Sequence, residues 1–263
     1  MSLREFVEFH QPALERDEVR HNLILGLLGR LLDAEHPELR WWTLGAPGQC
    51  AIQTPRHPII LGEPTAAQCR AFAEQLADDD YPGVVGPDEA PQLFVERAAE
   101  LGGKFSEPMP QCIHALRDKP IYPPISGGAR LVEPDDLALF SDWMIAFLRE
   151  AVPHEELPSR ENLEKTIAAR NYQFWTVDGD PVSMAGIVRR TRHVAAIAGV
   201  YTPPALRGRG YAGAATAAVV DSVFAEGRTA ACLYTDLRNP SSNRCYAKIG
   251  FMAVCRAWHY ARA

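Results

Sequence analysis

The stretch LRGRGYAGAATAAVVD, residues 206–221, decides between two folds for this chain. Its glycines have the G-x-G-x-x-G spacing of a dinucleotide-binding turn. The same letters also fit R-x-x-G-x-A, a loop that presents backbone N–H groups to a pyrophosphate where a helix begins. Both patterns predict a phosphate-binding loop, but in different folds.

The residues around these glycines disfavour the dinucleotide fold. Such a fold turns directly from a strand into its first glycine and needs further strand-helix units afterwards. Here residues 203–206 (PPAL) intervene, and only residues 237–263 follow Asp236, the acidic residue that would bind the ribose. An oxidoreductase that uses Gly208, Gly210 and Gly213 is therefore the minor alternative.

The composition is that of an ordinary globular protein. The 263 residues are 47% hydrophobic and 23% charged, with a net charge of −6. Because binding to nucleic-acid phosphates needs a basic face, we expect no nucleic-acid partner. The six cysteines show neither C-x-x-C pairs nor zinc-ligand spacing, so we expect reduced thiols and no metal.

The hydropathy of the chain predicts its location. Residues 1–20 are charged throughout and lack the apolar core of a signal peptide, and nowhere do about 18 apolar residues run together. We therefore expect a cytoplasmic protein with no membrane partner. A homodimer is compatible with the sequence.

Two halves of the chain repeat one order of elements. WWTLGAPGQCAIQT (41–54) and FWTVDGDPVSMAGIV (174–188) each predict a hairpin. A strand, a helix, a strand and a helix follow each hairpin, and Thr65 is the expected N-cap of the first helix in the first half. This repetition indicates an internal duplication of one α/β unit.

The segment DKPIYPPISGG, residues 118–128, lies between the halves and is rich in proline and glycine. Such a composition is typical of a linker. We therefore expect two domains, residues 1–125 and 126–263, in an α/β fold with a mixed sheet.

Two motifs in the second half resemble those of a known family. The run from Val200 to Ala212, VYTPPALRGRGYA, resembles motif A of the GNAT superfamily of acetyl-CoA-dependent N-acetyltransferases, with its R/Q-x-x-G-x-G/A loop. The run from Asn239 to Phe251, NPSSNRCYAKIGF, resembles motif B of that superfamily. The resemblance covers about residues 130–263, and it implies a GNAT fold there, preceded by a related but degenerate half.

The resemblance also implies where acetyl-CoA binds. The strands HVAAIAGVYT (193–202) and AACLYTD (230–236) would part and admit the pantetheine arm, and the N–H groups from Gly208 to Ala212 would bind the pyrophosphate. The residues assigned in this way to acetyl-CoA are Val200, Tyr201, Thr202, Arg207, Gly208, Arg209, Gly210, Tyr211, Ala212, Asn239 and Ser242.

Tyr246 is the expected catalytic residue. When an amine attacks the thioester, CoA leaves as a thiolate, and a phenol beside the sulfur can protonate it as a general acid. The resemblance thus implies transfer of an acetyl group from acetyl-CoA to a primary amine of a small molecule or peptide. The alternative is a non-catalytic acyl-CoA-binding or regulatory module.

That alternative is motivated by a missing general base. Many members of the superfamily carry an acidic residue on the strand before motif A, and residues 193–202 hold none. Glu155, Glu156 and His193 are weaker candidates near the acceptor. In the first half the equivalent turn, LGEPTAA (61–67), places Glu63 where a phosphate would lie, so we expect a structural role for that half.

Overall fold

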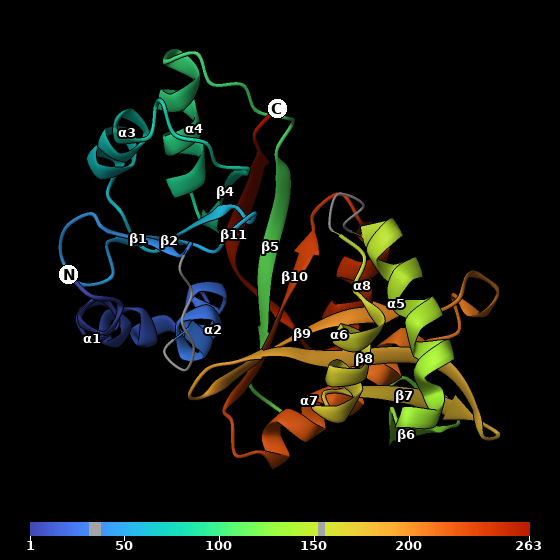
Figure 1. Ribbon diagram of the computed structural model, residues 1–263. Coiled ribbons are helices and arrows are strands. Elements are labelled where there is room, and N and C mark those ends of the chain that lie inside the picture. Colours follow the sequence, from blue (N-terminus) through green and yellow to red (C-terminus); the bar gives the residue numbers. More distant parts are fainter. Residues whose placement is uncertain (32–37, 152–155) are drawn as a thin grey trace. The chain divides into compact units, whose positions relative to one another are not determined.

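The computed structural model describes residues 1–31, 38–151 and 156–263, which form two compact units (Figure 1). Unit 1 comprises Met1–His114, Tyr234–Asn239 and Ala253–Ala263, and unit 2 comprises Ala115–Leu233 and Pro240–Met252.

This division differs from a single boundary near residue 125. The segment from Ala115 onward already belongs to unit 2, and the last residues of the chain return to unit 1. They return because the C-terminal strand pairs with a strand of unit 1, where Trp258 lies opposite Gly86 and Tyr260 opposite Val84. The backbone pairing of that strand therefore places residues 257–261 in one sheet with residues 83–87.

Unit 1 has helices on both faces of its sheet. Its helices are α1 (Leu3–Leu14), the 3-10 turn Glu15–Asp17, α2 (Asn22–Leu31), α3 (Ala66–Gln75) and α4 (Ala90–Glu100). Its strands are β1 (Arg40–Thr43), β2 (Cys50–Gln53), β3 (Ile59–Leu61), β4 (Gly83–Pro87), most of β5 (Met109–Leu116) and most of β11 (Met252–Ala261).

The strands of unit 1 lie in the order β1-β2-β3-β4-β11-β5. β1, β2 and β3 pair antiparallel, whereas β3 and β4 pair parallel across the α3 crossover. Because side chains alternate along a strand, Ile59 packs with α3 and α4, and its neighbour Ile60 packs with α1 and α2.

Unit 2 repeats this arrangement. Its helices are the 3-10 turn Pro134–Asp136, α5 (Leu137–Ala151), α6 (Arg160–Ala168), the 3-10 turn Pro204–Leu206, α7 (Tyr211–Ala225) and α8 (Pro240–Ile249). Its strands are β6 (Gly128–Leu131), β7 (Tyr172–Val177), β8 (Asp180–Arg190), β9 (Val194–Tyr201) and the first part of β10 (Ala230–Asp236).

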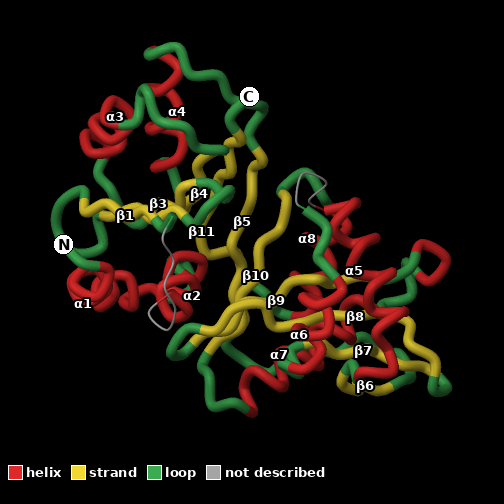
Figure 2. Tube along the Cα trace, in the orientation of Figure 1, coloured by secondary structure: helices red, strands yellow, loops and turns green. Residues whose placement is uncertain are grey.

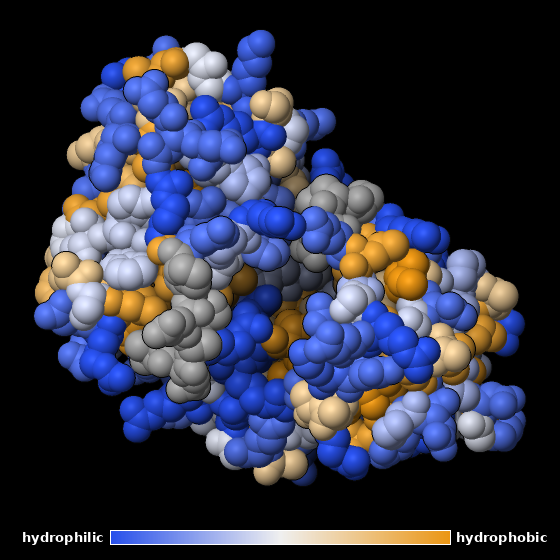
Figure 3. Space-filling model, in the orientation of Figure 1, coloured by the Kyte–Doolittle hydropathy of each residue, from blue (hydrophilic) through white to orange (hydrophobic). Residues whose placement is uncertain are grey.

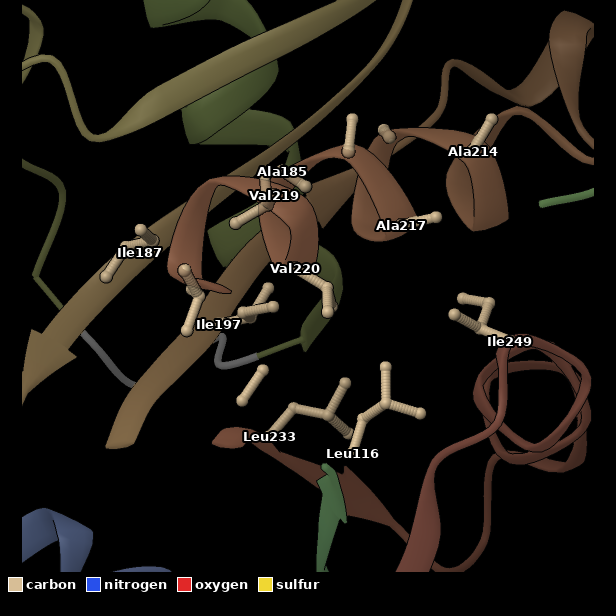
Figure 4. Packing of buried hydrophobic residues seen from close by; sticks show 14 of the residues in the cluster. Leu116, Ala185, Ile187, Ile197, Ala214, Ala217, Val219, Val220, Leu233 and Ile249 are labelled. Atoms are coloured by element: carbon tan, nitrogen blue, oxygen red, sulfur yellow. The ribbon is translucent and has the colours of Figure 1, made fainter. Parts of the chain in front are cut away.

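The strands of unit 2 lie in the order β10-β9-β8-β7-β6, shown as yellow tubes in Figure 2. β6 to β9 pair antiparallel in turn, and β9 and β10 pair parallel across α7. One face packs against α5 and α6 around Phe140 and Phe174. The other face packs against α7 and α8, where Val220 of α7 and Ile197 of β9 enter one hydrophobic cluster (Figure 4).

The two units share element order and pairing sense. In each, antiparallel pairings, two in unit 1 and three in unit 2, are followed by a parallel pairing across a helix, α3 in unit 1 and α7 in unit 2. The predicted α/β fold with mixed strand pairing is confirmed. Thr65 is the N-cap of α3, as its sequence predicts.

The proline-rich segment expected to be a linker is packed against α7 and α8 of unit 2. Ile121 N donates to the carbonyl of Ile249 at 2.9 Å, and the Tyr122 hydroxyl donates to Asp221 at 2.5 Å. The indole Nε1 of Trp175 donates to the Ser126 carbonyl. This segment covers a helix that is apolar on nearly all sides, which explains why it is ordered.

The visible surface is mostly hydrophilic, with hydrophobic residues between polar ones (Figure 3). Large hydrophobic side chains that remain exposed include Met252 and Ile121. Within the described ranges, no helix is long and apolar enough to cross a membrane.

Candidate active site

The site begins where β9 stops pairing with β10. Their parallel register covers only three residue pairs, from Ala230 opposite Val194 to Cys232 opposite Ala196. Both strands continue, but Leu233 and Ile197, the next residues of unit 2, are not paired. The carboxyl-terminal half of β9 therefore presents backbone N–H and C=O groups on this edge.

A β-bulge at Gly199 bends β9 where its pairing with β10 has ended. Along the pairing with β8, Met184 lies opposite Tyr201 and Gly186 opposite Ala198, so β9 has one extra residue between these pairs. Gly199 has φ +62°, a left-handed conformation that favours glycine. A Cβ atom at Gly199 would lie 2.6 Å from the hydroxyl of Tyr172. Both conditions require glycine at this position.

The loop after β9 leads into α7 with two glycines in left-handed conformations, Gly208 at φ +79° and Gly210 at φ +90°. Gly210 is the N-cap and has no side chain that could cap the helix. In the described part of the chain, nothing accepts a hydrogen bond from the backbone N–H groups of residues 208–213. Such donors at a helix N-terminus, where the helix dipole is positive, are suited to an anion.

The two arginines of the loop differ in their surroundings. The Arg207 guanidinium donates to both carboxylate oxygens of Glu150 at 2.9 and 2.8 Å, and its Nε donates to the Thr202 carbonyl. Arg207 therefore ties the loop to the last turn of α5. Arg209 is exposed, and its one hydrogen bond to a described residue is a long one, 3.5 Å, to the Ala205 carbonyl.

The three β9 residues assigned to acetyl-CoA point to different places. The side chain of Val200 packs against the cluster under α7, whereas Tyr201 is buried on the α5 side beside Trp143. The Thr202 hydroxyl is buried against the hydroxyl of Ser183 at 2.8 Å. Only backbone groups of these residues lie on the free edge of the strand.

Tyr246 is placed on α8, half-buried against the same cluster as Val200 and Tyr211. Its ring meets Phe251 edge-on at 6.0 Å. Burial raises the pKa of the Tyr246 phenol, so the hydroxyl keeps its proton at neutral pH. Ser242 lies on the same helix, while Asn239 belongs to unit 1.

The proline-rich segment borders the loop. A Cβ atom at Gly210 would lie 3.3 Å from Cβ of Pro123, and one at Gly213 would lie 3.1 Å from its ring. A Cβ atom at Gly208 would meet nothing within 4 Å. The loop is thus covered on the Gly213 side and open at Gly208.

The candidates for a general base are few. β9 carries no carboxylate, and Glu150 is paired with Arg207. Glu156 is exposed and His193 lies before β9, each with an interaction of its own, and Glu155 falls outside the described residues. Among the described residues, no cluster of His, Cys, Asp or Glu side chains is suited to a metal.

Sequence reasoning missed two residues of this site. Gly199 could have been found, because an isolated glycine in the strand pattern HVAAIAGVYT indicates a bulge. Glu150 had no such signal, because its role depends on α5 lying beside the loop.

In unit 1, β3 and β4 also stop pairing after a few residues, but these two strands stay close together. β3 and β4 pair at Ile59 and Ile60 only, yet a Cβ atom at Gly86 would lie 3.2 Å from that of Leu61. Glu63 follows β3, and its carboxylate lies 3.3 Å from Nε2 of the buried His21. These contacts leave only a small cavity beside Leu61 and Gly86.

The comparisons with known proteins agree with this geometry. Residues 137–251, from α5 to the turn before β11, match the model of the acetyltransferase (GNAT) family. No curated protein sequence matches the chain.

Several solved structures share the fold at low sequence identity. An X-ray structure of a Drosophila protein is similar over 100% of this chain and 97% of that one, with 14% identity and a TM-score of 0.72. A GCN5-related N-acetyltransferase from Kribbella flavida covers 92% and 95%, with 18% identity and a TM-score of 0.62.

A tandem GNAT protein from the clavulanic acid biosynthesis pathway is similar over 91% of this chain and 87% of that one, with 14% identity and a TM-score of 0.55. Since these matches extend over most of the chain, both halves take part in the similarity. The predicted GNAT fold, preceded by a related α/β half, is confirmed.

Proposed function

We propose, from the premise that residues 137–251 are a GNAT acetyltransferase domain, that the chain transfers an acetyl group from acetyl-CoA to a primary amine of a small molecule or peptide. Members of this family transfer acyl groups, and acetyl-CoA is their donor. The observation that carries the proposal is the free edge of β9 beside the uncapped start of α7.

The residues of unit 2 fit acetyl-CoA. The pyrophosphate would accept hydrogen bonds from the N–H groups of residues 208–213, and the Gly208 side of the loop is open to it. Arg209 would add a positive charge that no carboxylate neutralises in the described chain, whereas Arg207 would hold the loop through Glu150. The pantetheine amides would pair with the free edge of β9 near Val200 and Thr202.

The proposed reaction is a direct transfer. The amine nitrogen forms a bond to the thioester carbon while the carbonyl π electrons move to oxygen, and the oxyanion then re-forms the carbonyl as the C–S bond breaks. The sulfur electrons leave as CoA thiolate, which takes a proton from the Tyr246 hydroxyl. The nitrogen loses a proton to water, and the phenolate regains one from solvent.

The place of Tyr246 supports this role, because it lies on α8 against the apolar cluster that Val200 of β9 also joins. Burial raises the pKa of the phenol, which keeps it protonated but makes it a weaker acid, so the proton passes to sulfur only as the C–S bond breaks. Because β9 lacks a carboxylate, the attacking amine would release its proton through water rather than to a strand residue.

The direct test measures CoA thiol release by the whole chain with acetyl-CoA and a panel of primary amines. Calorimetry with acetyl-CoA and with NAD in parallel separates the alternatives. We expect acetyl-CoA to bind and at least one amine to be acetylated. Acetyl-CoA binding without turnover on any amine would favour a binding module, and NAD binding alone would favour the oxidoreductase.

A further inference from the structure

Tyr172 of β7 lies across two strands of unit 2. It is in register with Gly186 of β8, and Gly186 is in register with Ala198 of β9. A Cβ atom at Gly186 would lie 2.5 Å from Cδ1 of Tyr172, and one at Gly199 would lie 2.6 Å from its hydroxyl. The ring therefore rests on Gly186, and the hydroxyl occupies the place of a Gly199 side chain.

The Tyr172 hydroxyl has no hydrogen-bond acceptor among the described residues. The ring packs edge-on against Phe140 of α5 at 5.0 Å, and no described residue hydrogen-bonds its O–H group. By contrast, the hydroxyl of Tyr122 in the same unit donates to Asp221. The hydroxyl is also not among the fully buried, unpartnered polar atoms of the described residues, so it is accessible and free to donate to a bound ligand.

The place where this hydroxyl lies is the Gly199 bulge, beside the edge that β9 no longer shares with β10. Tyr172 is 6% exposed, so it is buried but not sealed. Burial also raises the pKa of its phenol, which therefore remains a hydrogen-bond donor at neutral pH.

We propose that the Tyr172 hydroxyl donates a hydrogen bond to the acyl carbonyl oxygen of a thioester bound at the Gly199 bulge. This inference rests on the proposed function. The hydroxyl would not release its proton. It would stabilise the negative charge that develops on the carbonyl oxygen when the amine attacks, in addition to backbone N–H groups of β9.

The test compares Tyr172→Phe with wild type and with Tyr81→Phe, which removes the hydroxyl of a buried tyrosine in unit 1. Phenylalanine keeps the ring on Gly186, so we expect the fold to be retained. Tyr172→Phe should lower kcat by about 10²-fold and raise the acetyl-CoA KM by no more than about tenfold, because the hydrogen bond is stronger to the developing oxyanion than to the ground-state carbonyl. Tyr81→Phe should leave both unchanged.

A binding measurement separates hydrogen bonding from a structural role. The probes are CoA and a ketone analogue in which CH₂ replaces the thioester sulfur and the carbonyl remains. Tyr172→Phe should weaken binding of the ketone about threefold to tenfold and leave CoA binding unchanged. A merely structural role would shift both affinities together.

The possible results are distinct. If wild type binds both probes and Tyr172→Phe changes neither kcat nor the ratio of the two affinities, the role of Tyr172 is wrong while the acetyltransferase proposal stands. If wild type binds neither probe, the acetyltransferase proposal is wrong and the role of Tyr172 with it.

Discussion

The first turns of α3 and α7 occupy equivalent places in the two units, yet they treat their free N–H groups in opposite ways. At α3, the Thr65 hydroxyl accepts from Gln68 N, and the Gln68 side chain accepts from Thr65 N. At α7, Gly210 offers no side chain, and the first donors have no partner in the described chain. The first N–H groups of α3 are hydrogen-bonded by side chains of the protein, whereas those of α7 are available to an anion.

The strands that precede these helices also differ, because only those of unit 1 stay close to their parallel neighbour. Leu61 closes the gap at Gly86 in unit 1, whereas β9 in unit 2 bends away at Gly199. The comparison shows that a shared fold does not carry the ability to bind a ligand. That ability depends on a few residues at the strand end and the helix start.

The largest expected effect is the loss of the bulge. Gly199→Ala would force alanine into a left-handed conformation and place its Cβ against the Tyr172 hydroxyl. We expect about 2–4 kcal/mol lower stability in urea unfolding. Acetylation should fall by more than about 10²-fold, because the reacting groups are displaced.

The matched control is Gly179→Ala in the β7–β8 turn, where φ is +91° but no atom lies within 4 Å of a Cβ. It should cost about 1 kcal/mol and leave kcat unchanged. Equal losses of activity in both variants would mean that the bulge has no special role.

A somewhat smaller effect is expected at Tyr246, which has no counterpart on α4 because that helix contains no tyrosine. Tyr246→Phe should lower kcat by about 10²-fold and preserve acetyl-CoA binding, measured by CoA release and calorimetry. Since burial raises the phenol pKa, wild-type kcat should not decline through deprotonation of Tyr246 near neutral pH. Unchanged turnover in the variant would remove Tyr246 from the mechanism.

The difference between α3 and α7 can be removed by giving α7 a polar N-cap, as in Gly210→Asn. Asparagine tolerates a left-handed conformation, and its side chain would fill the loop beside Pro123 and compete with the ligand for N–H donors. Gly210→Asn should therefore weaken acetyl-CoA binding about tenfold in calorimetry, or about 1.4 kcal/mol. Gly227→Asn, at the far end of α7 with φ +79°, is the control and should bind like wild type.

The smallest effect is expected from removing the cap of α3. Thr65→Ala should lower the midpoint of urea unfolding by an amount equivalent to about 1 kcal/mol, since the backbone N–H of Gln68 loses its acceptor. Acetyl-CoA affinity and kcat should not change. Ser159→Ala, which removes the N-cap of α6, should give a similar loss of stability. A change in acetyl-CoA affinity with Thr65→Ala alone would contradict the structural role of unit 1.

Much of the fold follows from local patterns. Glycine turns between β-branched and aromatic runs predict the β7–β8 hairpin, and Thr65 followed by Gln68 predicts the start of α3. Pro203 and Pro204 followed by Gly208 and Gly210 predict the loop before α7, because such residues fix or free the backbone locally.

Other parts could not be predicted in this way. The segment 118–128 has the composition of a linker, but it packs on α7 because that helix is apolar on nearly all sides. The pairing of Arg207 with Glu150 removes from the loop a charge that the motif suggested for the phosphate. The return of β11 to unit 1 depends on hydrogen bonds with β4, a strand far away in sequence.

The sequence by itself determined the repeated α/β elements and the glycine loop, since periodicity and backbone preference act over a few neighbouring residues, whereas Tyr246 was indicated only by the resemblance of residues 239–251 to motif B. Only the tertiary structure decided that β9 leaves β10 after Cys232, that Arg207 faces Glu150, and that the Tyr172 hydroxyl lies at Gly199. These features depend on side chains and strands that meet across the sheet, and sequence spacing carries no record of such distances.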